Sequence, residues 1–271
     1  MSLIYEPSGK AREYSPLALN VYKNCDHQCK YCYVRNFQPN FSEFVQPRIL
    51  SGLDNEASKA SRQILLCFTG DPYCSANDAY QNTRKALEIL KKNHCTVAIL
   101  SKGGTRCLQD LDLFVSWPDR RFKVGATLTF VSPEKSMTVE PGAALPADRL
   151  DALEKLHAAG VHTWASIEPV MEAEESIAII RASLSCVDEY KVGKLNHQKS
   201  TTDWRKFCID AVSVLHKAGK RFYVKFDLAA FAPSGFLTPE ETDPETVFLP
   251  DRPSSLFQSR SVEEQIMFPG M

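Results

Sequence analysis

The chain has 271 residues, of which 44% are apolar and 24% charged, and its formal net charge is −1. This composition excludes a disordered chain, and the near-zero net charge gives no overall field that would attract nucleic acid or a membrane surface. No apolar run approaches the roughly 18 residues that span a bilayer, and the N-terminus does not resemble a signal peptide. We therefore expect a cytoplasmic protein without membrane contact.

Short apolar runs alternate with longer amphipathic segments along most of the chain. Seven runs have the composition of strands: Leu17–Lys23, Gln63–Thr69, Thr96–Ser101, Lys123–Phe130, Val161–Val170, Val187–Leu195 and Arg221–Phe226. Helical periodicity and helix-end signals mark three segments between them: Asn77–Asn93, Pro146–Gly160 and Thr201–Lys220.

This alternation predicts an α/β fold in which helices cover a parallel sheet. Six strand–helix units followed by a seventh strand suit a partial (β/α)6 barrel of the TIM type better than a complete eightfold barrel. We expect the barrel to occupy residues 1–231. Residues 232–271 are rich in proline and acidic side chains, which predicts a C-terminal extension that either wraps the barrel or is partly mobile.

Three of the nine cysteines are clustered in the stretch "KNCDHQCKYCYVRNF". Cys25, Cys29 and Cys32 have C-x3-C-x2-C spacing and polar neighbours, which argues against three core cysteines that coincide by chance. A disulfide would leave one thiol over, and a closed zinc site would need a fourth ligand that the nearby His27 is badly placed to supply. Three thiolates are sufficient for a 4Fe–4S cluster with one open iron. The other six cysteines are scattered, as expected of free thiols in a reducing compartment.

The three cysteines follow the first predicted strand, and aromatic Tyr31 stands directly before the third of them. This arrangement resembles the radical S-adenosylmethionine (radical SAM) superfamily over roughly Leu17 to Val224. The resemblance implies a 4Fe–4S cluster whose open iron binds the methionine part of S-adenosylmethionine. An electron from a flavodoxin- or ferredoxin-type donor then cleaves the cofactor, and the resulting deoxyadenosyl radical abstracts hydrogen from the substrate. Tyr31 would lie against the adenine.

Several small or polar residues follow the other predicted strands, at the rim where such barrels carry their active sites. Gly70 permits close backbone approach and Asp71 can accept from an ammonium group, although the same segment also fits an ordinary strand-to-helix turn. Lys102 is a candidate partner for the cofactor carboxylate. Thr127, Thr129 and Ser166 are candidates for contacts to the cofactor ribose. Glu168 and Asn196 are further polar candidates for cofactor contacts at strand ends.

Five segments indicate one branch of the superfamily. "CKYCYV", "TGDPY", "LSKGG", "CLQDLDLF" and "EPGAALPADRLDALEKLHAAGV" resemble spore photoproduct lyases, whose cofactor radical takes hydrogen from a thymine dimer in DNA. The resemblance implies radical transfer through Tyr31 and Tyr33, which flank the third cysteine. Lys102 matches the lysine that this branch has at the end of strand three.

One position departs from this branch. Photoproduct lyases quench the product radical with a cysteine at the end of the second strand, where this chain has Phe68. Cys67 stands beside it, and alternation along a strand predicts that it points to the opposite side. We expect Cys74 to lie beyond the strand end, on the rim, either as the radical-active thiol or as an inert thiol at a helix start.

Charge is unevenly distributed near the C-terminus. Residues 191–225 carry nine Lys/Arg and two acidic residues, a net charge of +7, whereas residues 227–271 have a net charge of −6. With Trp204 and Tyr223, the basic segment is compatible with a phosphate-bearing substrate. A solvated helix face, partly neutralised by the acidic tail, is the alternative.

These observations favour a radical SAM enzyme of lyase or isomerase type that acts on a thymine-related base. The reaction would be photoproduct repair or base modification, with DNA or another nucleoside-containing molecule as substrate. Within the same class, the alternative substrate is a peptide or a small metabolite. The alternative from another class is a non-catalytic structural or sensor protein that binds iron–sulfur or zinc.

Overall fold

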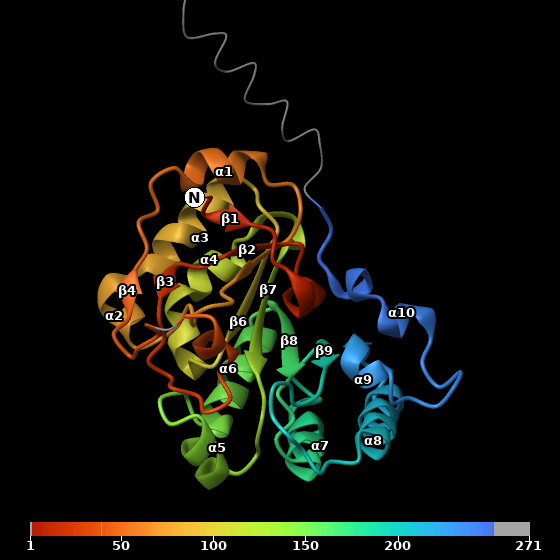
Figure 1. Ribbon diagram of the computed structural model, residues 1–271. Helices are drawn as coiled ribbons and strands as arrows, with labels where there is room; N and C mark the ends of the chain where they lie inside the picture. The colour runs from red at the N-terminus through yellow and green to blue at the C-terminus, as the bar shows by residue number, and fades with distance from the viewer. Residues whose placement is uncertain (1, 39, 252–271) are drawn as a thin grey trace, which may run out of the picture.

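The computed structural model describes residues 2–38 and 40–251, in which one large sheet is surrounded by helices (Figure 1). The strand order is β1-β2-β5-β6-β7-β8-β9-β10. All neighbours from β2 to β10 are parallel, and β1 is an antiparallel edge strand. The strands are β1 (Ile4–Tyr5), β2 (Leu17–Leu19), β5 (Ile64–Leu66), β6 (Val97–Ser101), β7 (Phe122–Thr127), β8 (His162–Ile167), β9 (Glu189–Val192) and β10 (Arg221–Val224).

Helices connect the successive parallel strands and lie outside the sheet. The α-helices are α1 (Leu53–Lys59), α2 (Ala76–Tyr80), α3 (Asn82–Lys92), α4 (Leu111–Val115), α5 (Pro133–Val139), α6 (Pro146–Ala158), α7 (Ala173–Ser183), α8 (Trp204–Lys217), α9 (Phe226–Ala229) and α10 (Pro239–Thr242). Short 3₁₀ helices are η1 (Gly9–Glu13), η2 (Tyr33–Asn36), η3 (Gly104–Asp110), η4 (Pro118–Arg120) and η5 (Pro244–Val247). The predicted α/β partial barrel, with six strand–helix units and a seventh strand, is confirmed.

The first predicted strand is wrong in its second half. The chain leaves the barrel after β2, and β3 (Tyr22–Lys23) pairs instead with β4 (Gln46–Pro47) in a separate two-stranded sheet. The side chain of Asn20 explains the break, because its Oδ1 accepts hydrogen bonds from the backbone amides of Phe68 and Thr69 at 2.8 and 2.9 Å. These side-chain bonds take the place of backbone bonds between β2 and β5, so the strand ends and the cysteine-containing loop begins.

The predicted helix Asn77–Asn93 is two helices, α2 and α3, because Gln81 between them has a left-handed backbone with φ of 49°. Polar side chains hold the break. Asn77 Oδ1 accepts from the Thr83 amide at 3.1 Å, and Asn82 Nδ2 donates to the Val21 carbonyl at 2.7 Å. The other two predicted helices are confirmed as α6 and α8.

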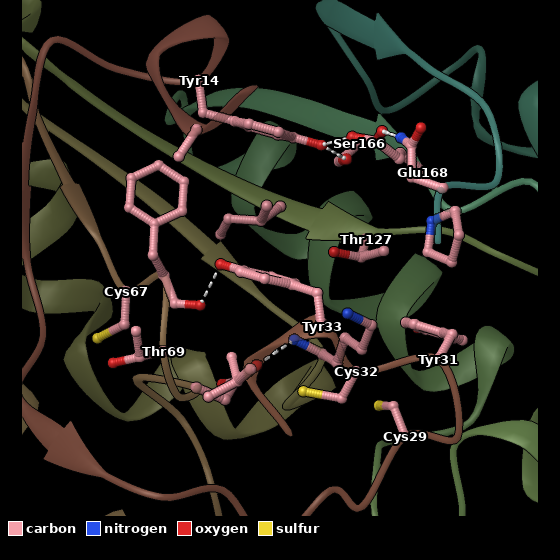
Figure 2. Close-up of a pocket in the computed structure, with 18 of the residues that line it drawn as sticks. Tyr14, Cys29, Tyr31, Cys32, Tyr33, Cys67, Thr69, Thr127, Ser166 and Glu168 are labelled. Carbon is pink, nitrogen blue, oxygen red and sulfur yellow. Dashed lines mark hydrogen bonds between the residues drawn. The ribbon is translucent and has the colours of Figure 1, made fainter. Parts of the chain in front are cut away.

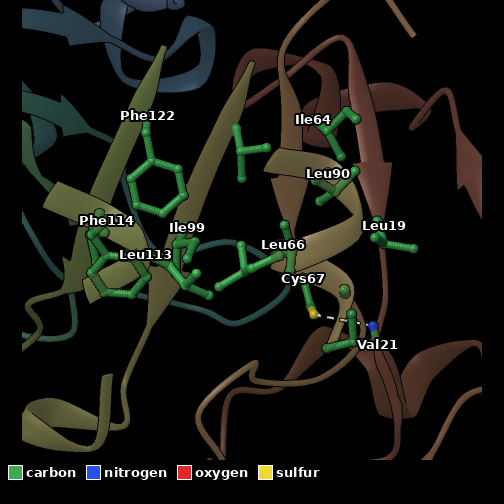
Figure 3. Close-up of a cluster of buried hydrophobic side chains, with 14 of the residues drawn as sticks. Leu19, Val21, Ile64, Leu66, Cys67, Leu90, Ile99, Leu113, Phe114 and Phe122 are labelled. Carbon is green, nitrogen blue, oxygen red and sulfur yellow. Dashed lines mark hydrogen bonds between the residues drawn. The ribbon is translucent and has the colours of Figure 1, made fainter. Parts of the chain in front are cut away.

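The largest hydrophobic cluster fills the space between the sheet and the helices α1, α3 and α4 (Figure 3). It contains Leu66 from β5, Ile99 from β6 and Leu90 from α3, all fully buried. A second cluster packs beneath α7 and α8, which lie side by side (Figure 1). These two clusters fix the helices to the outside of the sheet, so the carboxyl ends of the strands converge on one rim.

The inside of the barrel is layered. Trp164 fills the middle, where a Cβ at Gly125 would lie 2.6 Å from its ring, so only glycine leaves room. At the amino end, Lys123 Nζ pairs with Glu189 Oε1 at 2.7 Å and donates to the carbonyl of Val247 at 2.5 Å. Residues 244–250 therefore cover this end of the barrel, and residues 252–271 of the predicted extension lie outside the described residues.

No helix in residues 2–38 and 40–251 combines the length and the apolar character that crossing a membrane requires.

Candidate active site

A pocket of about 480 Å³ opens at the carboxyl ends of the parallel strands (Figure 2). Its wall brings together residues from the cysteine loop and from the ends of β5 to β9. In Figure 2 the thiols of Cys29 and Cys32 lie on one side, and Tyr14, Ser166 and Glu168 lie on the other. The lining includes twelve of the predicted site residues: Cys25, Cys29, Tyr31, Cys32, Tyr33, Gly70, Asp71, Lys102, Thr127, Ser166, Glu168 and Asn196.

The cysteine loop is held by its own polar side chains and by the segment after β7. Gln28 Nε2 donates to the Cys25 carbonyl at 2.7 Å, and Arg35 Nη2 donates to Gln28 Oε1 at 2.6 Å. Gly142 donates its amide to the His27 carbonyl at 3.0 Å. These bonds fix a loop without regular structure so that three unpaired thiols face one pocket.

The three thiols are ligands of the soft type that iron–sulfur clusters take. Among the described residues, no three His, Cys, Asp or Glu side chains converge so that they could hold one metal ion. Burial, with Asp71 nearby, raises the pKa of Cys25, and burial also raises that of Cys29. A bound cationic centre would supply the charge needed to deprotonate such thiols. The residues present therefore fit an iron–sulfur cluster by the chemistry of their donor atoms.

Tyr31 is fixed by a buried ion pair that the sequence did not indicate. Its hydroxyl donates to Glu140, and Glu140 Oε2 pairs with Arg149 Nη2 at 2.6 Å. Glu140 and Arg149 are each 1% exposed. The Lys102 ammonium lies 5.5 Å from the centroid of the Tyr31 ring. The ring is thus held in one orientation beside the cysteines.

Asp71 braces the ends of β5 and β6. It accepts from the Tyr73 amide at 2.8 Å, the Ser101 hydroxyl at 2.6 Å and the Lys102 amide at 2.7 Å. The carboxylate is therefore largely occupied by donors of this chain. Gly70 is needed for close packing here, because a Cβ would lie 2.8 Å from the Asn24 carbonyl oxygen.

On the opposite wall, Glu168 accepts hydrogen bonds from several side chains. It accepts from Tyr14 Oη at 2.6 Å, Asn196 Nδ2 at 2.9 Å and Lys225 Nζ at 2.5 Å. Tyr14 Oη also lies 2.8 Å from Ser166 Oγ. No sequence pattern indicated Tyr14, which precedes the first barrel strand and reaches this wall only in the folded chain.

Two polar atoms near the thiols have no hydrogen-bond partner among the described residues. They are Thr69 Oγ1 and His27 Nε2, both buried and both in residues that line the pocket. Buried polar atoms are nearly always satisfied, so Thr69 Oγ1 is available to a ligand, whereas His27 Nε2 lies 3.8 Å from Asp26 Oδ1. The sequence predicted neither of them.

Two predicted site residues lie elsewhere. Cys74 is fully buried in the hydrophobic core and does not line the pocket, so its predicted position on the rim is wrong. After Asp71 the chain turns inward, with the Cys74 amide bonded to the Asp71 carbonyl at 3.4 Å. Thr129 is also outside the pocket. It lies beyond the end of β7, and its hydroxyl donates to Glu140 at 3.1 Å.

The region of Phe68 also differs from expectation. Cys67 and Phe68 both line the pocket, although strand alternation predicted opposite directions. The reason is that β5 ends at Leu66, so alternation does not extend to these residues. The Phe68 ring meets Tyr14 edge-on at 6.1 Å, and its carbonyl accepts from Tyr33 Oη at 2.8 Å (Figure 2).

The predicted basic face does not form one surface. Lys191 and Lys225 are buried inside the barrel, and Lys206 pairs with Asp210 on α8. Tyr223 is fully buried and donates to Glu13 at 2.7 Å. Of the nine basic residues in this segment, only Lys194 and Lys225 line the pocket.

Comparisons with solved structures find proteins that share this fold. The structure of Streptococcus suis SuiB bound to S-adenosylmethionine has a TM-score of 0.60 and 9% identity, covering 76% of this chain and 49% of that one. Spore photoproduct lyase complexed with dinucleoside spore photoproduct has a TM-score of 0.62 and 11% identity, covering 81% and 78%. At these low identities, the likeness shows that this chain shares its fold with both proteins.

Sequence comparisons find uncharacterized relatives. A protein of Methanocaldococcus jannaschii is 26% identical over 160 residues, 56% of this chain and 60% of its own length. A Mycobacterium tuberculosis protein is 27% identical over 168 residues, 49% of its length, so this chain matches only part of both. A protein of Acidianus two-tailed virus is 23% identical over 223 residues, 72% of each chain. No family model matches the chain.

Proposed function

We propose that this chain is a radical SAM enzyme whose 4Fe–4S cluster is held by Cys25, Cys29 and Cys32. The observation that carries the proposal is the position of the three thiols. All three line one pocket at the carboxyl ends of a partial parallel barrel. This is the end at which barrel enzymes build their active sites.

When bound, the cluster and S-adenosylmethionine would supply one-electron cleavage of the sulfonium and a deoxyadenosyl radical. The chain's own residues bind and orient these groups. Lys102 has no carboxylate partner among the described residues and suits the cofactor carboxylate, and the fixed ring of Tyr31 suits the adenine. We assign ribose contacts to Thr127 and to the wall built around Ser166, Glu168 and Asn196. Asp71 and Gly70 shape the end of β5 against the cysteine loop.

We propose a thymine-related base in DNA as the substrate, in photoproduct repair or in base modification by isomerisation. Two observations support this choice. The chain resembles photoproduct lyases in several segments, and the pocket has an aromatic wall formed by Tyr14, Tyr33 and Phe68 that suits a planar base. Phe68 replaces the quenching cysteine of the lyases, which favours isomerisation, in which the abstracted hydrogen returns to the product.

A peptide substrate is the second candidate, because SuiB, a structural neighbour, is known bound to its precursor peptide SuiA. Deuterium transfer between labelled cofactor and product distinguishes the candidates. The reactions to compare contain dimer-bearing DNA, modified-thymine DNA, free nucleosides and peptides. Label appearing only in a peptide would contradict the DNA proposal.

Anaerobic reconstitution tests the enzyme class. We expect a brown protein with about four irons per chain that releases 5′-deoxyadenosine under dithionite. Cys32→Ala should lose both the cluster and all cofactor cleavage. Cys208→Ala is the matched control, because Cys208 is a fully buried thiol outside the pocket, and it should retain both. A colourless protein with one tightly bound zinc, or cleavage by Cys32→Ala, would contradict the proposal.

A further inference from the structure

Four lysines line the pocket: Lys10, Lys102, Lys194 and Lys225. Two of them form ion pairs and two do not. Lys10 pairs with Asp227, and Lys225 pairs with Glu168 and Glu13. Lys102 and Lys194 have no carboxylate within ion-pair distance among the described residues, although both are half-buried. A partly desolvated cation without an ion-pair partner is unfavourable, so each of these two lysines indicates a place for an anion.

The two unpaired lysines follow different strands. Lys102 follows β6 and lies over Tyr31, on the side of the thiols, where the proposed function places the cofactor carboxylate. Lys194 follows β9, and β7 and β8 separate the two strands in the sheet. Adjacent strands are about 4.8 Å apart, so the two lysines are anchored about 14 Å apart along the sheet. The two ammoniums also lie over different rings, that of Tyr31 for Lys102 and that of Trp204 for Lys194, which places them at separate parts of the wall.

The surroundings of Lys194 leave its charge uncompensated. The chain passes close to Glu168 at Gly193, where a Cβ would lie 2.8 Å from the Glu168 carboxyl carbon. Lys194 nevertheless does not pair with Glu168, whose oxygens already accept from three other side chains. Its ammonium lies 5.5 Å from the Trp204 ring centroid and 3.5 Å from the Leu195 carbonyl. Both are weak contacts, and neither carries a full negative charge.

We propose that Lys194 forms an anion subsite in the substrate half of the pocket, which takes a phosphate or carboxylate group attached to the nucleoside substrate. His197, on the same loop, lines the pocket beside it. This inference rests on the proposed function for the nucleoside part of the substrate. The aromatic wall would hold the base, while Lys194 holds an anion that either belongs to the DNA backbone or is a substituent on the base.

Binding of three nucleosides to the reconstituted protein tests the subsite. Isothermal titration with S-adenosylmethionine present compares thymidine, thymidine 5′-monophosphate and 5-carboxymethyl-2′-deoxyuridine. We expect at least one anionic nucleoside to bind about tenfold more tightly than thymidine, as a hydrogen bond to a charged group predicts. Tightening by the phosphate alone identifies the DNA backbone as the source, and tightening by the carboxylate alone identifies a substituent on the base.

Variants connect this preference to one side chain. Lys194→Gln should abolish the preference for the anion, and Lys194→Arg should restore most of it. Lys199→Gln is the matched control, because Lys199 is exposed in the same loop and does not line the pocket. A purely structural role for Lys194 would lower stability without changing the ratio of the dissociation constants. Equal affinity for all three nucleosides, or an undiminished preference in Lys194→Gln, would overturn the subsite.

Cofactor cleavage by the unmodified protein is measured in the same preparation. Its absence would overturn the proposed function, whereas the ratio of dissociation constants still decides whether the anion subsite exists.

Discussion

The two ends of the barrel differ in whether their lysines have ion-pair partners. At the amino end, Lys123 and Glu189 are each 1% exposed, and Lys123 has both a carboxylate and a carbonyl partner. At the carboxyl end, two lysines that line the pocket, Lys102 and Lys194, have no carboxylate within ion-pair distance among the described residues. Buried polar atoms without hydrogen-bond partners occur at both ends, for example Arg121 Nε and His162 Nε2 at the amino end and Thr69 Oγ1 at the carboxyl end. Half-buried lysines without ion-pair partners in one pocket are what binding of anions predicts.

Removing the buried Lys123–Glu189 ion pair at the amino end of the barrel should have the largest effect on folding. Glu189→Gln leaves the buried Lys123 charge uncompensated, so we expect the free energy of unfolding to fall by about 3–5 kcal/mol. Urea denaturation of the variant and the unmodified protein measures this loss. Asp210→Asn, which breaks the exposed pair with Lys206 on α8, should cost less than about 0.5 kcal/mol. Similar small losses in both variants would show that the buried pair is not a main support.

The same pair gives an acid-dependent stability. Burial alone would raise the pKa of Glu189, but Lys123 and His162 outweigh burial and lower it from 4.5 to about 2. A carboxyl with a lowered folded-state pKa stabilises the protein above its unfolded pKa, and this stabilisation is lost as pH falls. The stability that Glu189 provides should therefore disappear between about pH 4.5 and 2. Glu189→Gln should lack this part of the pH dependence.

At the carboxyl end of the barrel, removing the charge of a pocket lysine should affect binding more than folding. Lys102→Gln deletes the proposed partner of the cofactor carboxylate, and we expect S-adenosylmethionine to bind roughly 10- to 100-fold more weakly. Equilibrium binding to the reconstituted protein measures this change. Lys30→Gln removes an exposed lysine from the cysteine loop outside the pocket and should leave the affinity close to that of the unmodified protein. Unchanged affinity in Lys102→Gln would remove Lys102 from the cofactor site.

Local patterns predicted much of this architecture. The periodicity located all seven barrel strands, and twelve of the fourteen predicted site residues line the pocket, because the ends of parallel strands meet at one rim. The contributions of Tyr14 and Glu140 were not predictable in this way. Tyr14 reaches Glu168 across 154 positions of the sequence, and Glu140 reaches Tyr31 across 109. Such contacts depend on the folded path of loops, which has no periodic signal.

Cys74 shows where local reasoning fails. The strand pattern placed it beyond the second predicted strand, at the rim, but Asp71 and Pro72 begin a turn that carries the next residues into the core. The direction of a turn depends on the bonds that close it. Here those bonds include the Thr83 hydroxyl, which donates to the Pro72 carbonyl at 2.5 Å from a helix eleven residues further along the chain.

The smallest effect on chemistry should therefore come from Cys74→Ala. Burial raises the pKa of the Cys74 thiol, which is fully buried and stays protonated within the core. We expect unchanged cofactor cleavage, unchanged deuterium distribution in the product, and a stability loss of roughly 1 kcal/mol. Cys67→Ala is the informative companion, because Cys67 is also buried, with a pKa raised to about 12, yet it lines the pocket. A product altered by Cys74→Ala and not by Cys67→Ala would mean that the core thiol reaches the radical, against its position in the fold.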